Sequence, residues 1–317
     1  VRAVFGSTHP HDFTWRTTDG KRFLGLVRVY TNRLEICVAQ PGRPRPKTFG
    51  ADGSLSIVLN KNGANVPNYD SDDVVAALQK LNARMKWDDQ GNVVELSLAN
   101  SRISGPGFLR LNLLTKLRWL NLGFIPVTDD GLKHLHLEGL PNLQDLNLSS
   151  QITDSGLVHL KGLANLQGLY LHVSRQITDA GLVHLKGMTN LQELHLHDTQ
   201  ATDVGLAHLK GLTGLKKLWL GINNSKITDA GLVHLKGLTH LEFLNLPGGL
   251  TVTDVGLEHF KWLTNLQTLR LRGDKITGAG LVHLKGLTEL RTLRFLGPKL
   301  TDAGLVHLKG MTNLQEL

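Results

Sequence analysis

A phrase of eleven residues recurs along most of this chain. It reads Ile-Thr-Asp-Ala-Gly-Leu-Val-His-Leu-Lys-Gly at 177–187 and again at 227–237, and a Leu-x-x-Leu-x-Leu unit follows each copy. Such a period is typical of a solenoid, in which each unit buries its apolar face only by stacking on its neighbours. The first leucine-type position of the unit recurs every 23 to 26 residues, in nine complete repeats and the start of a tenth, at Val93, Leu117, Leu143, Leu166, Leu191, Leu215, Leu241, Leu266, Leu290 and Leu314.

A single repeat predicts a strand followed by a short helix. Leu143, Leu146 and Leu148 end in the alternation of a strand with one buried face. Thr153 then stands where a helix N-cap belongs, and Asp154 falls in the first turn, where the helix dipole favours an acidic residue. Leucines continue at helical spacing at Leu157, Leu160 and Leu163. Gly156, between them, stands where we expect a side chain to obstruct packing.

Stacking of these units predicts an α/β fold. The strands should run parallel, about 4.8 Å apart, along the inner side of a horseshoe arc, with the short helices on its outer side. The repeats span 93–317. The segment 71–92 is expected to cap the first repeat with a helix and a turn, because an uncapped end would expose the core. Asp73 could begin that helix, with one apolar stripe formed by Val74, Leu78, Leu81 and Met85.

The residues before the cap belong to a different unit. The alternation at 23–30, 33–38 and 55–59 predicts β-strands, so 1–62 is interpreted as a partial β domain and 63–70 as a linker. The chain begins at Val1 and stops inside a repeat at Leu317, which we interpret as a fragment of a longer protein.

Composition favours a binding protein over an enzyme. Hydrophobic residues make up 41% of the chain, aromatic residues only 5%, and the formal net charge is +8. The single cysteine, Cys37, excludes an internal disulfide framework and a cysteine-rich zinc site. The chain lacks H-E-x-x-H, G-x-S-x-G, G-x-x-x-x-G-K-[ST] and the kinase signatures. It also lacks a signal peptide and a run of eighteen apolar residues. We therefore expect no enzymatic activity and no cofactor, and the compartment stays undetermined.

The repeats resemble the leucine-rich-repeat family. The Ile-Thr-Asp-x-Gly-Leu segment at the start of the helix is similar to the cysteine-containing subclass of F-box substrate receptors, and more closely to bacterial proteins with long Thr-Asp-Ala-Gly-Leu arrays. The cysteines of that subclass are replaced here by Thr, Asn or Ala, and no F-box is present. The resemblance covers about 71–317 and implies a scaffold that binds other macromolecules.

The N-terminal unit carries a second resemblance. RLEICV at 33–38, PGRPRP at 41–46 and Phe49 look like the closing strands of a small lipocalin-like β domain of bacterial proteins. The resemblance covers about forty residues. It implies a partial β-barrel with no defined chemistry.

Large aromatic and charged residues occupy the strand positions that should face solvent. Side chains of this kind are enriched among the residues that dominate binding energy. We therefore predict a protein partner on the inner face, in contact with Trp119, Tyr170, His172, Glu193, His195, His197, Lys217, Trp219, Phe243, Arg270, Arg272 and Arg294. Cross-strand packing alone would also favour aromatics at these positions.

Two histidine patterns leave alternatives open. His172, His195 and His197 should lie within about 5–7 Å of one another, which is a candidate metal site, although a hydrated neutral cluster is the simpler reading. The second pattern recurs on the helices, together with Lys161, Lys186, Lys210, Lys236, Lys261, Lys285 and Lys309, and it comprises His134, His159, His184, His208, His234, His259, His283 and His307. Both ladders should be solvated on the outer side. A glycan or polyanion could bind this basic ladder or the inner arginines.

The expected partner is therefore a protein, bound by a monomer. Nucleic acid is not expected, and no transmembrane segment is present in the sequence. A third alternative is that the chain is the recognition arm of a larger multidomain protein, similar to a substrate receptor.

Overall fold

The computed structural model of the chain forms two compact units, Val1–Ala76 and Ala77–Leu317. The structure describes residues 11–16, 22–29, 33–39, 54–60, 65–67, 74–75, 78–79, 81–99, 111–135, 137–171, 174–220, 226–246, 251–296, 299 and 301–317.

The N-terminal unit contains an antiparallel meander in the order β1-β2-β3-β4-β5. Its strands are β1 (His11–Arg16), β2 (Arg22–Val29), β3 (Arg33–Ala39), β4 (Ser54–Asn60) and β5 (Asn65–Pro67). Three of them, β2, β3 and β4, agree with the predicted strands to within one residue at each end. The interpretation of 63–70 as a plain linker is wrong at β5, which pairs with β4. A three-residue edge strand that ends in proline leaves no alternation to recognise.

The second unit is built on a sheet of ten described strands in the order β15-β14-β13-β12-β11-β10-β9-β8-β7-β6. From β7 to β15 neighbouring strands pair in parallel, as predicted, whereas β6 pairs antiparallel with β7. Their bounds are β6 (Arg84–Trp87), β7 (Val93–Ser97), β8 (Trp119–Asn121), β9 (Asp145–Asn147), β10 (Gly168–Tyr170), β11 (Glu193–Leu196), β12 (Lys217–Leu220), β13 (Phe243–Leu246), β14 (Thr268–Arg272) and β15 (Thr292–Leu296).

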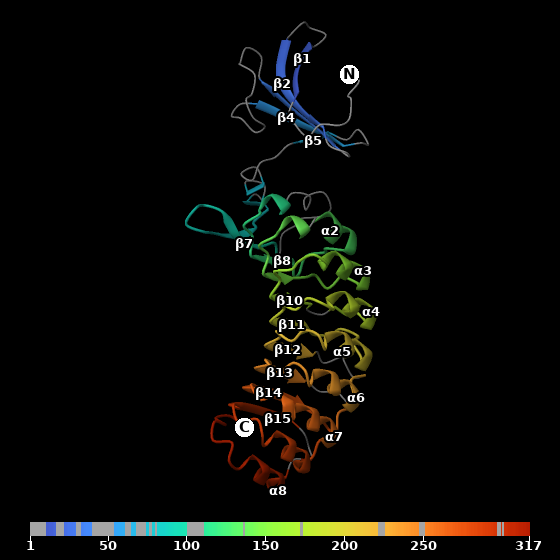
Figure 1. The fold of residues 1–317 in the computed structure, drawn as a ribbon, viewed down its shortest axis with the longest axis vertical. Coiled ribbons are helices and arrows are strands. Elements are labelled where there is room, and N and C mark those ends of the chain that lie inside the picture. The colour runs from blue at the N-terminus through green and yellow to red at the C-terminus, as the bar shows by residue number, and fades with distance from the viewer. Residues whose placement is uncertain are drawn as a thin grey trace. The chain divides into compact units, whose positions relative to one another are not determined.

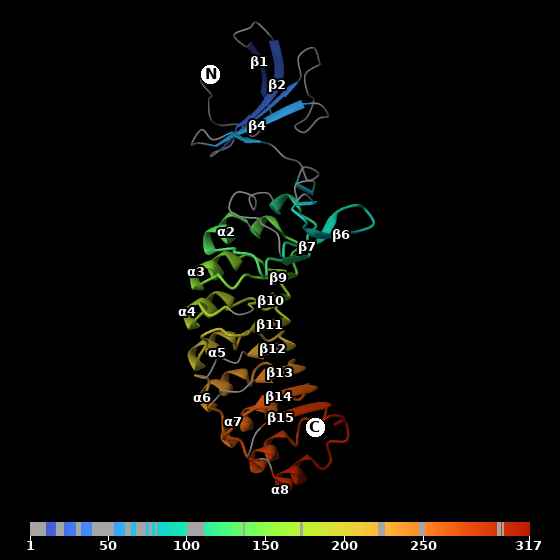
Figure 2. The same ribbon diagram turned by 180° about the vertical axis from the view of Figure 1, so that it is seen from behind.

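Short helices lie opposite the sheet, one set for each repeat, and within this unit the strands line the concave side (Figures 1 and 2). The α-helices are α2 (Asp129–His134), α3 (Asp154–Leu157), α4 (Asp179–Leu182), α5 (Asp203–Leu209), α6 (Asp229–Leu232), α7 (Asp254–Leu257) and α8 (Asp302–Leu305). The 3₁₀ helices are η2 (Leu111–Leu113), η3 (Leu137–Gly139), η4 (Val158–Leu160), η5 (Val183–Leu185), η6 (Val233–Leu235), η7 (Glu258–Trp262), η8 (Gly278–Leu284) and η9 (Val306–Leu308).

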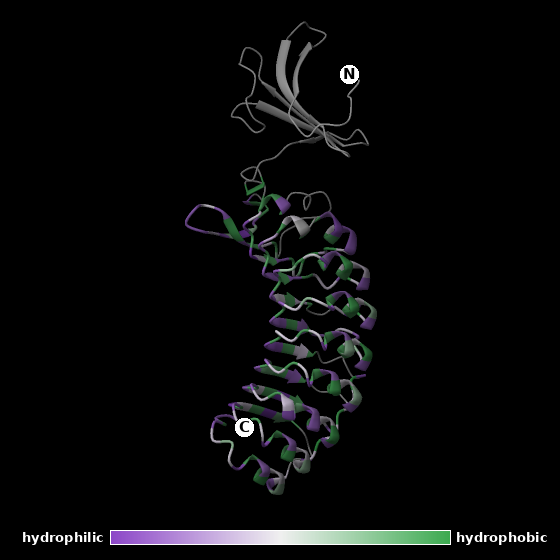
Figure 3. Ribbon diagram, in the orientation of Figure 1, coloured by the Kyte–Doolittle hydropathy of each residue, from purple (hydrophilic) through white to green (hydrophobic). Residues whose placement is uncertain are grey.

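The repeated leucines form the core between sheet and helices. In β11, Leu194 and Leu196 are fully buried, whereas Glu193 and His195 face outward, as period-two alternation requires. Hydrophilic and hydrophobic residues alternate along the strands in Figure 3. Gly156 also has the predicted role, because a Cβ there would lie against the Asp129 carboxylate and 2.7 Å from the Ile152 side chain.

A ladder of hydrogen bonds joins each helix start to the next. Asp129 accepts a hydrogen bond from the Thr153 backbone N–H at 2.9 Å and another from its hydroxyl at 2.5 Å. The Thr153 hydroxyl in turn accepts from the Ser155 N–H at 3.2 Å, which is the predicted N-cap. The same pairing recurs at Asp154–Thr178, Asp179–Thr202, Asp203–Thr228, Asp229–Thr253 and Asp254–Thr277. The aspartate therefore does more than complement a dipole: it joins two repeats.

The ladder stops where glycine replaces the aspartate. Gly278 occupies that position, and Thr301 in the following repeat makes no side-chain cap hydrogen bond. With no carboxylate between them, the helix starts come close together, so that a Cβ on Gly278 would lie 2.6 Å from the Gly304 Cα. Comparison of this repeat with the others thus shows that loss of the aspartate carboxylate accompanies loss of the threonine N-cap hydrogen bond.

The predicted capping segment is only partly helical. Val74, Val75, Leu78 and Gln79 are helical, with Val74 and Leu78 buried, and Asp73 lies outside the described residues. The predicted helical stripe is wrong at its end. Asn82 takes a left-handed φ of 58°, and Met85 belongs to β6, whose backbone pairs with β7. Pairing with the open sheet edge outweighs the helical spacing of the apolar residues.

Candidate partner-binding surface

The strand face is the surface formed by the outward side chains of β7 to β15. Register places Tyr170 of β10, His195 of β11 and Trp219 of β12 side by side on neighbouring strands. Of the twelve predicted contacts, eleven lie in the described part of this face or directly after its strands, and His172 lies outside the described residues. The period-two pattern therefore places these side chains together across separate repeats.

Four rings and one guanidinium form a continuous row, here called the aromatic stack. The ring centroids of Tyr170 and His195 are 4.7 Å apart and tilted by 55°. His195 stacks on Trp219 at 3.9 Å, and Trp219 stacks on Phe243 at 4.3 Å. The Arg270 guanidinium carbon lies 5.4 Å from the Phe243 ring centroid, within cation–π range. In the two stacked pairs, His195–Trp219 and Trp219–Phe243, the neighbouring rings cover one another's faces.

Polar contacts fix the stack from one side. Glu193 Oε1 lies 2.8 Å from His195 Nε2, and Glu193 Oε2 lies 3.2 Å from the Lys217 ammonium. Glu193 and His195 are mostly buried, whereas the Lys217 side chain is 48% exposed. The carboxylate thus orients the imidazole that stands in the middle of the stack.

A glycine allows Tyr170 to fold back toward β9. A Cβ on Gly168 would meet the Asp145 carboxylate and would lie 3.0 Å from the Tyr170 hydroxyl oxygen. The hydroxyl donates to Asp145 Oδ1 at 3.4 Å. Burial, together with the charges of Glu193 and Asp145, holds the pKa of Tyr170 well above its usual value. Burial also raises the pKa of Asp145, the Tyr170 hydrogen bond opposes this, and the Glu193 charge adds to it.

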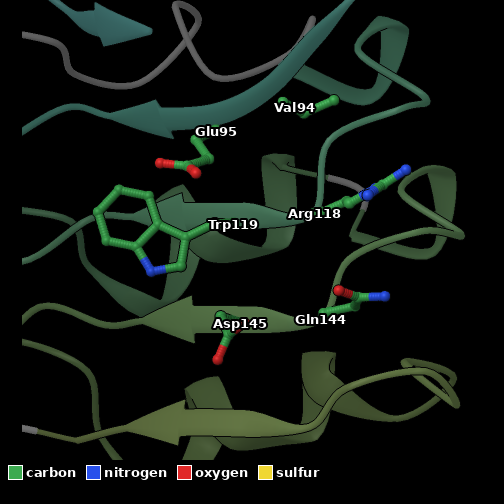
Figure 4. Close-up of a pocket in the computed structure, with 6 residues that line it drawn as sticks. All are labelled: Val94, Glu95, Arg118, Trp119, Gln144 and Asp145. Carbon is green, nitrogen blue, oxygen red and sulfur yellow. The ribbon is translucent and has the colours of Figure 1, made fainter. Parts of the chain in front are cut away.

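The remaining predicted contacts lie outside the stack. Arg272 of β14 is exposed, and Arg294 of β15 donates to Glu316 Oε1 from Nε at 2.9 Å and from Nη2 at 2.6 Å. Trp119 of β8 is half-buried, and its indole lines a pocket of about 350 Å³ near the start of the sheet (Figure 4). The predicted set therefore divides into a central stack, an arginine-rich end and a separate aromatic position.

The candidate metal site is not assembled by the described residues. His195 and His197 lie with their ring centroids 5.6 Å apart, and the third candidate, His172, lies outside the described residues. Within the ranges that the structure describes, no group of three His, Cys, Asp or Glu residues could hold a metal ion.

His197 provides a test by pH. Burial lowers its pKa from the ordinary value of 6.5, and the neighbouring Asp198 opposes that shift in part. An unfolded chain therefore takes up this proton before the folded chain does, so the stability that neutral His197 contributes is present above about pH 6.5 and is lost as the pH falls below it. We expect NMR titration to place the His197 midpoint below 6.5, and His197→Gln to flatten the acid side of the stability profile. A midpoint at or above 6.5 would contradict this.

The helix side carries the two basic ladders. The seven lysines of the repeated position are all exposed, as predicted. The histidine ladder is not fully solvated: His134 is exposed, but the seven histidines from His159 to His307 are half-buried. The reason is local geometry, because the Val-His-Leu segments mostly form 3₁₀ turns, whose three-residue period points side chains differently from an α-helix.

Sequence reasoning missed exposed aromatic residues outside the strands of the sheet. Phe124, in the loop after β8, is 86% exposed and has a φ of 62°. Trp262, at the end of η7, is 54% exposed, and the Lys261 ammonium lies 5.4 Å from its ring centroid. Phe124 and Trp262 both replace the usual residue of the repeat at positions outside the strands. This difference from the other repeats could have identified them in the sequence. Trp262 also provides a tryptophan on the helix side for comparison with Trp219.

Comparison with known proteins gives similarity of structure only. No family model matches the sequence, and no curated protein matches it. Similar solved structures include an internalin (inlF) from Listeria monocytogenes, with 22% identity, a TM-score of 0.39, and coverage of 77% of this chain and 86% of that one. The plant peptide hormone receptor RGFR1, solved in complex with RGF2, has 17% identity and a TM-score of 0.45. The match covers 68% of this chain and 37% of that one. PEPR1, solved in complex with AtPEP1, has 19% identity and a TM-score of 0.43, and the match covers 74% of this chain and 36% of that one. Each match therefore spans little more than a third of the receptor chain.

The fold of the second unit is a leucine-rich-repeat solenoid. The geometry of the unit shows this, namely parallel strands one repeat apart from β7 to β15, buried leucines at most of the repeated positions, and short helices between the strands. Among the described residues, no helix is long and apolar enough to cross a membrane.

Proposed function

We propose that the solenoid is a non-enzymatic interaction module that binds a protein partner on its strand face. The observation that carries the proposal is the aromatic stack from Tyr170 to Arg270. Its members stand at positions where the repeats differ from one another, whereas the leucines and the Asp–Thr ladder account for the fold. A solenoid needs no such residues in order to stack.

The physics of the stack suits recognition. Aromatic and arginine side chains supply large contact areas, and rings already held by their neighbours lose little conformational freedom when a partner binds. Tyr170, His195 and Trp219 also place polar ring atoms beside apolar edges. The half-buried rings and the exposed Arg270 and Arg272 together offer an apolar centre with a cationic end.

The test compares two tryptophans. Trp219→Ala removes the centre of the strand-face stack, and Trp262→Ala removes an exposed tryptophan from the helix side. We expect Trp219→Ala to weaken partner binding by about 2 kcal/mol, roughly thirtyfold, as is typical of a dominant interface residue. Arg270→Ala should weaken it by a smaller amount, and Trp262→Ala should leave it unchanged. Partners recovered from the native source by affinity capture are quantified against each purified variant.

Equal recovery of every partner by the wild type, Trp219→Ala and Arg270→Ala would remove the strand face from consideration. Loss of binding in Trp262→Ala alone would move the interface to the helix side. Circular dichroism of each variant separates a loss of contact from a loss of fold.

The exposed lysine ladder favours one second candidate function, polyanion or glycan binding on the helix side. Among the described residues, Lys261 is the one member of the ladder with a carboxylate in ion-pair distance, Glu258 at 2.8 Å. Salt discriminates the two candidates, since polyanion binding falls steeply with ionic strength and an aromatic interface does not.

Further proposals concern the context of the module. We infer that it acts as a cofactor-free monomer and as the recognition arm of a larger protein. The likeness to F-box-type substrate receptors and the lipocalin-like interpretation of 1–62 are kept as proposals of the same kind. The limit at 92 between the capping segment and the repeats is also a proposal.

A further inference from the structure

A pocket at the start of the strand face has a composition different from the aromatic stack. Register places Glu95 of β7, Trp119 of β8 and Asp145 of β9 side by side, so an indole stands between two carboxylate side chains. The pocket is half-open, has a volume of about 350 Å³ and is lined by Val94, Glu95, Arg118, Trp119, Gln144 and Asp145. Figure 4 shows the indole at β8, between the strands that carry Glu95 and Asp145.

Trp119 differs from the aromatic residues of the stack. Tyr170, His195, Trp219 and Phe243 each have a ring of a neighbouring strand against them. Among the residues that the structure describes, no ring or cation stacks on Trp119, although the residue is only half-buried. Its indole is therefore available to a ligand, and tryptophan is the aromatic residue that attracts cations most strongly.

The charges around this indole favour a cation. Glu95 and Asp145 are two strand spacings apart, roughly 10 Å between their backbones, so a planar group stacked on the face of the indole between them has a carboxylate on either side. Burial raises the pKa of Asp145, the Tyr170 hydrogen bond opposes this shift, and the Glu193 charge adds to it. A bound cation would stabilise the ionised Asp145 carboxylate.

The chain's own cations leave the position open. Lys86 pairs with Glu95 at 2.8 Å, but its side chain is 72% exposed, and such surface pairs contribute little. Arg118 lines the pocket, yet Figure 4 shows its side chain directed away from the indole ring. Its charge helps to lower the pKa of Asp88, in the turn before β7, after the larger effect of the Asn92 hydrogen bonds.

We infer that this pocket binds an arginine side chain of the protein partner. The guanidinium stacks on the Trp119 indole and donates hydrogen bonds to Glu95 and Asp145. Arginine fits better than lysine because its planar group stacks on an aromatic face while its N–H groups, in the same plane, reach carboxylates on both sides. The inference rests on the proposed function for the identity of the ligand as a protein, but the pocket itself can be tested without the partner.

The experiment uses fluorine NMR of the full chain labelled with 5-fluorotryptophan. The chain has five tryptophans, and Trp119→Phe assigns the resonance of interest. The probe is the tripeptide acetyl-Gly-Arg-Gly-amide, with the citrulline peptide as a neutral analogue of the same shape. We expect the Trp119 resonance to shift with a Kd on the order of 1 mM for arginine, as suits one isolated side chain, and at least about tenfold weaker binding for citrulline. The Trp219 resonance should stay in place.

Matched variants test the two carboxylates. Asp145→Asn and Glu95→Gln should each weaken arginine binding about threefold to tenfold, and Asp130→Asn, at an exposed aspartate of α2, should not change it. An equal shift with citrulline, unchanged affinity in both carboxylate variants, or movement of Trp219 instead of Trp119 would overturn the inference. Because the titration contains no partner, arginine binding at Trp119 would stand even if Trp219→Ala left partner capture intact. Conversely, loss of partner capture in Trp219→Ala would stand even if the Trp119 resonance did not shift with arginine.

Discussion

Replacing Asp129 by alanine is expected to destabilise the protein by about 3 kcal/mol, although the residue is neither apolar nor in the core. Its carboxylate accepts two hydrogen bonds from Thr153, and the Thr153 hydroxyl that donates one of them accepts from Ser155. Hydrogen bonds to a charged group contribute about 1.5–3 kcal/mol each, and the variant also leaves the half-buried Thr153 N–H without its acceptor. Urea unfolding followed by circular dichroism measures the loss.

The next residue provides the control. Asp130 lies in the first turn of the same helix and is exposed, so Asp130→Ala should change the unfolding free energy by no more than about 0.5 kcal/mol. If helix-dipole compensation were the main role of these aspartates, the two variants would behave alike. Equal effects would therefore show that the hydrogen bonds between repeats contribute little.

The leucine-rich-repeat fold could be predicted because its core is one residue type at a fixed period. The spacing of Leu143 and Leu146 predicts the strand, and the spacing of Leu157 and Leu160 predicts the helix, without any knowledge of distant contacts. The Asp–Thr ladder could not be predicted in the same way. Asp129 and Thr153 are 24 residues apart, and only the stacking distance between repeats brings them into hydrogen-bond contact.

The strand face was predictable as a set of residues but not as an arrangement. Alternation along each strand identifies Tyr170, His195 and Trp219 as outward, and parallel pairing places them in one row. Phe243 pairs across from Lys217 rather than from Trp219, yet its ring stacks on Trp219, because side-chain rotamers decide that contact. The face as a binding surface stays a prediction until its variants are measured.

The second large loss of stability is expected for a core residue that differs from the repeat. Phe260 stands where the other repeats have a leucine such as Leu160 or Leu235, and it is the largest fully buried side chain among the described residues. Phe260→Ala should destabilise the protein by about 4 kcal/mol, because it removes a whole ring from a packed site that collapses only in part. Phe260→Leu should cost about 1 kcal/mol even though it restores the repeated residue, since the neighbours are packed around a ring.

Trp262, two residues further along the same 3₁₀ helix, tests whether burial or ring size determines the effect. It is the larger aromatic residue, but it is 54% exposed, and we expect Trp262→Ala to cost less than about 1 kcal/mol. A gain in stability for Phe260→Leu would show that the solenoid tolerates any repeat in its consensus form. A loss of stability for Phe260→Leu would show that this repeat is packed against its neighbours around the phenylalanine ring. The core of the solenoid would then depend on the residue that differs from the repeat and not only on the repeated leucines.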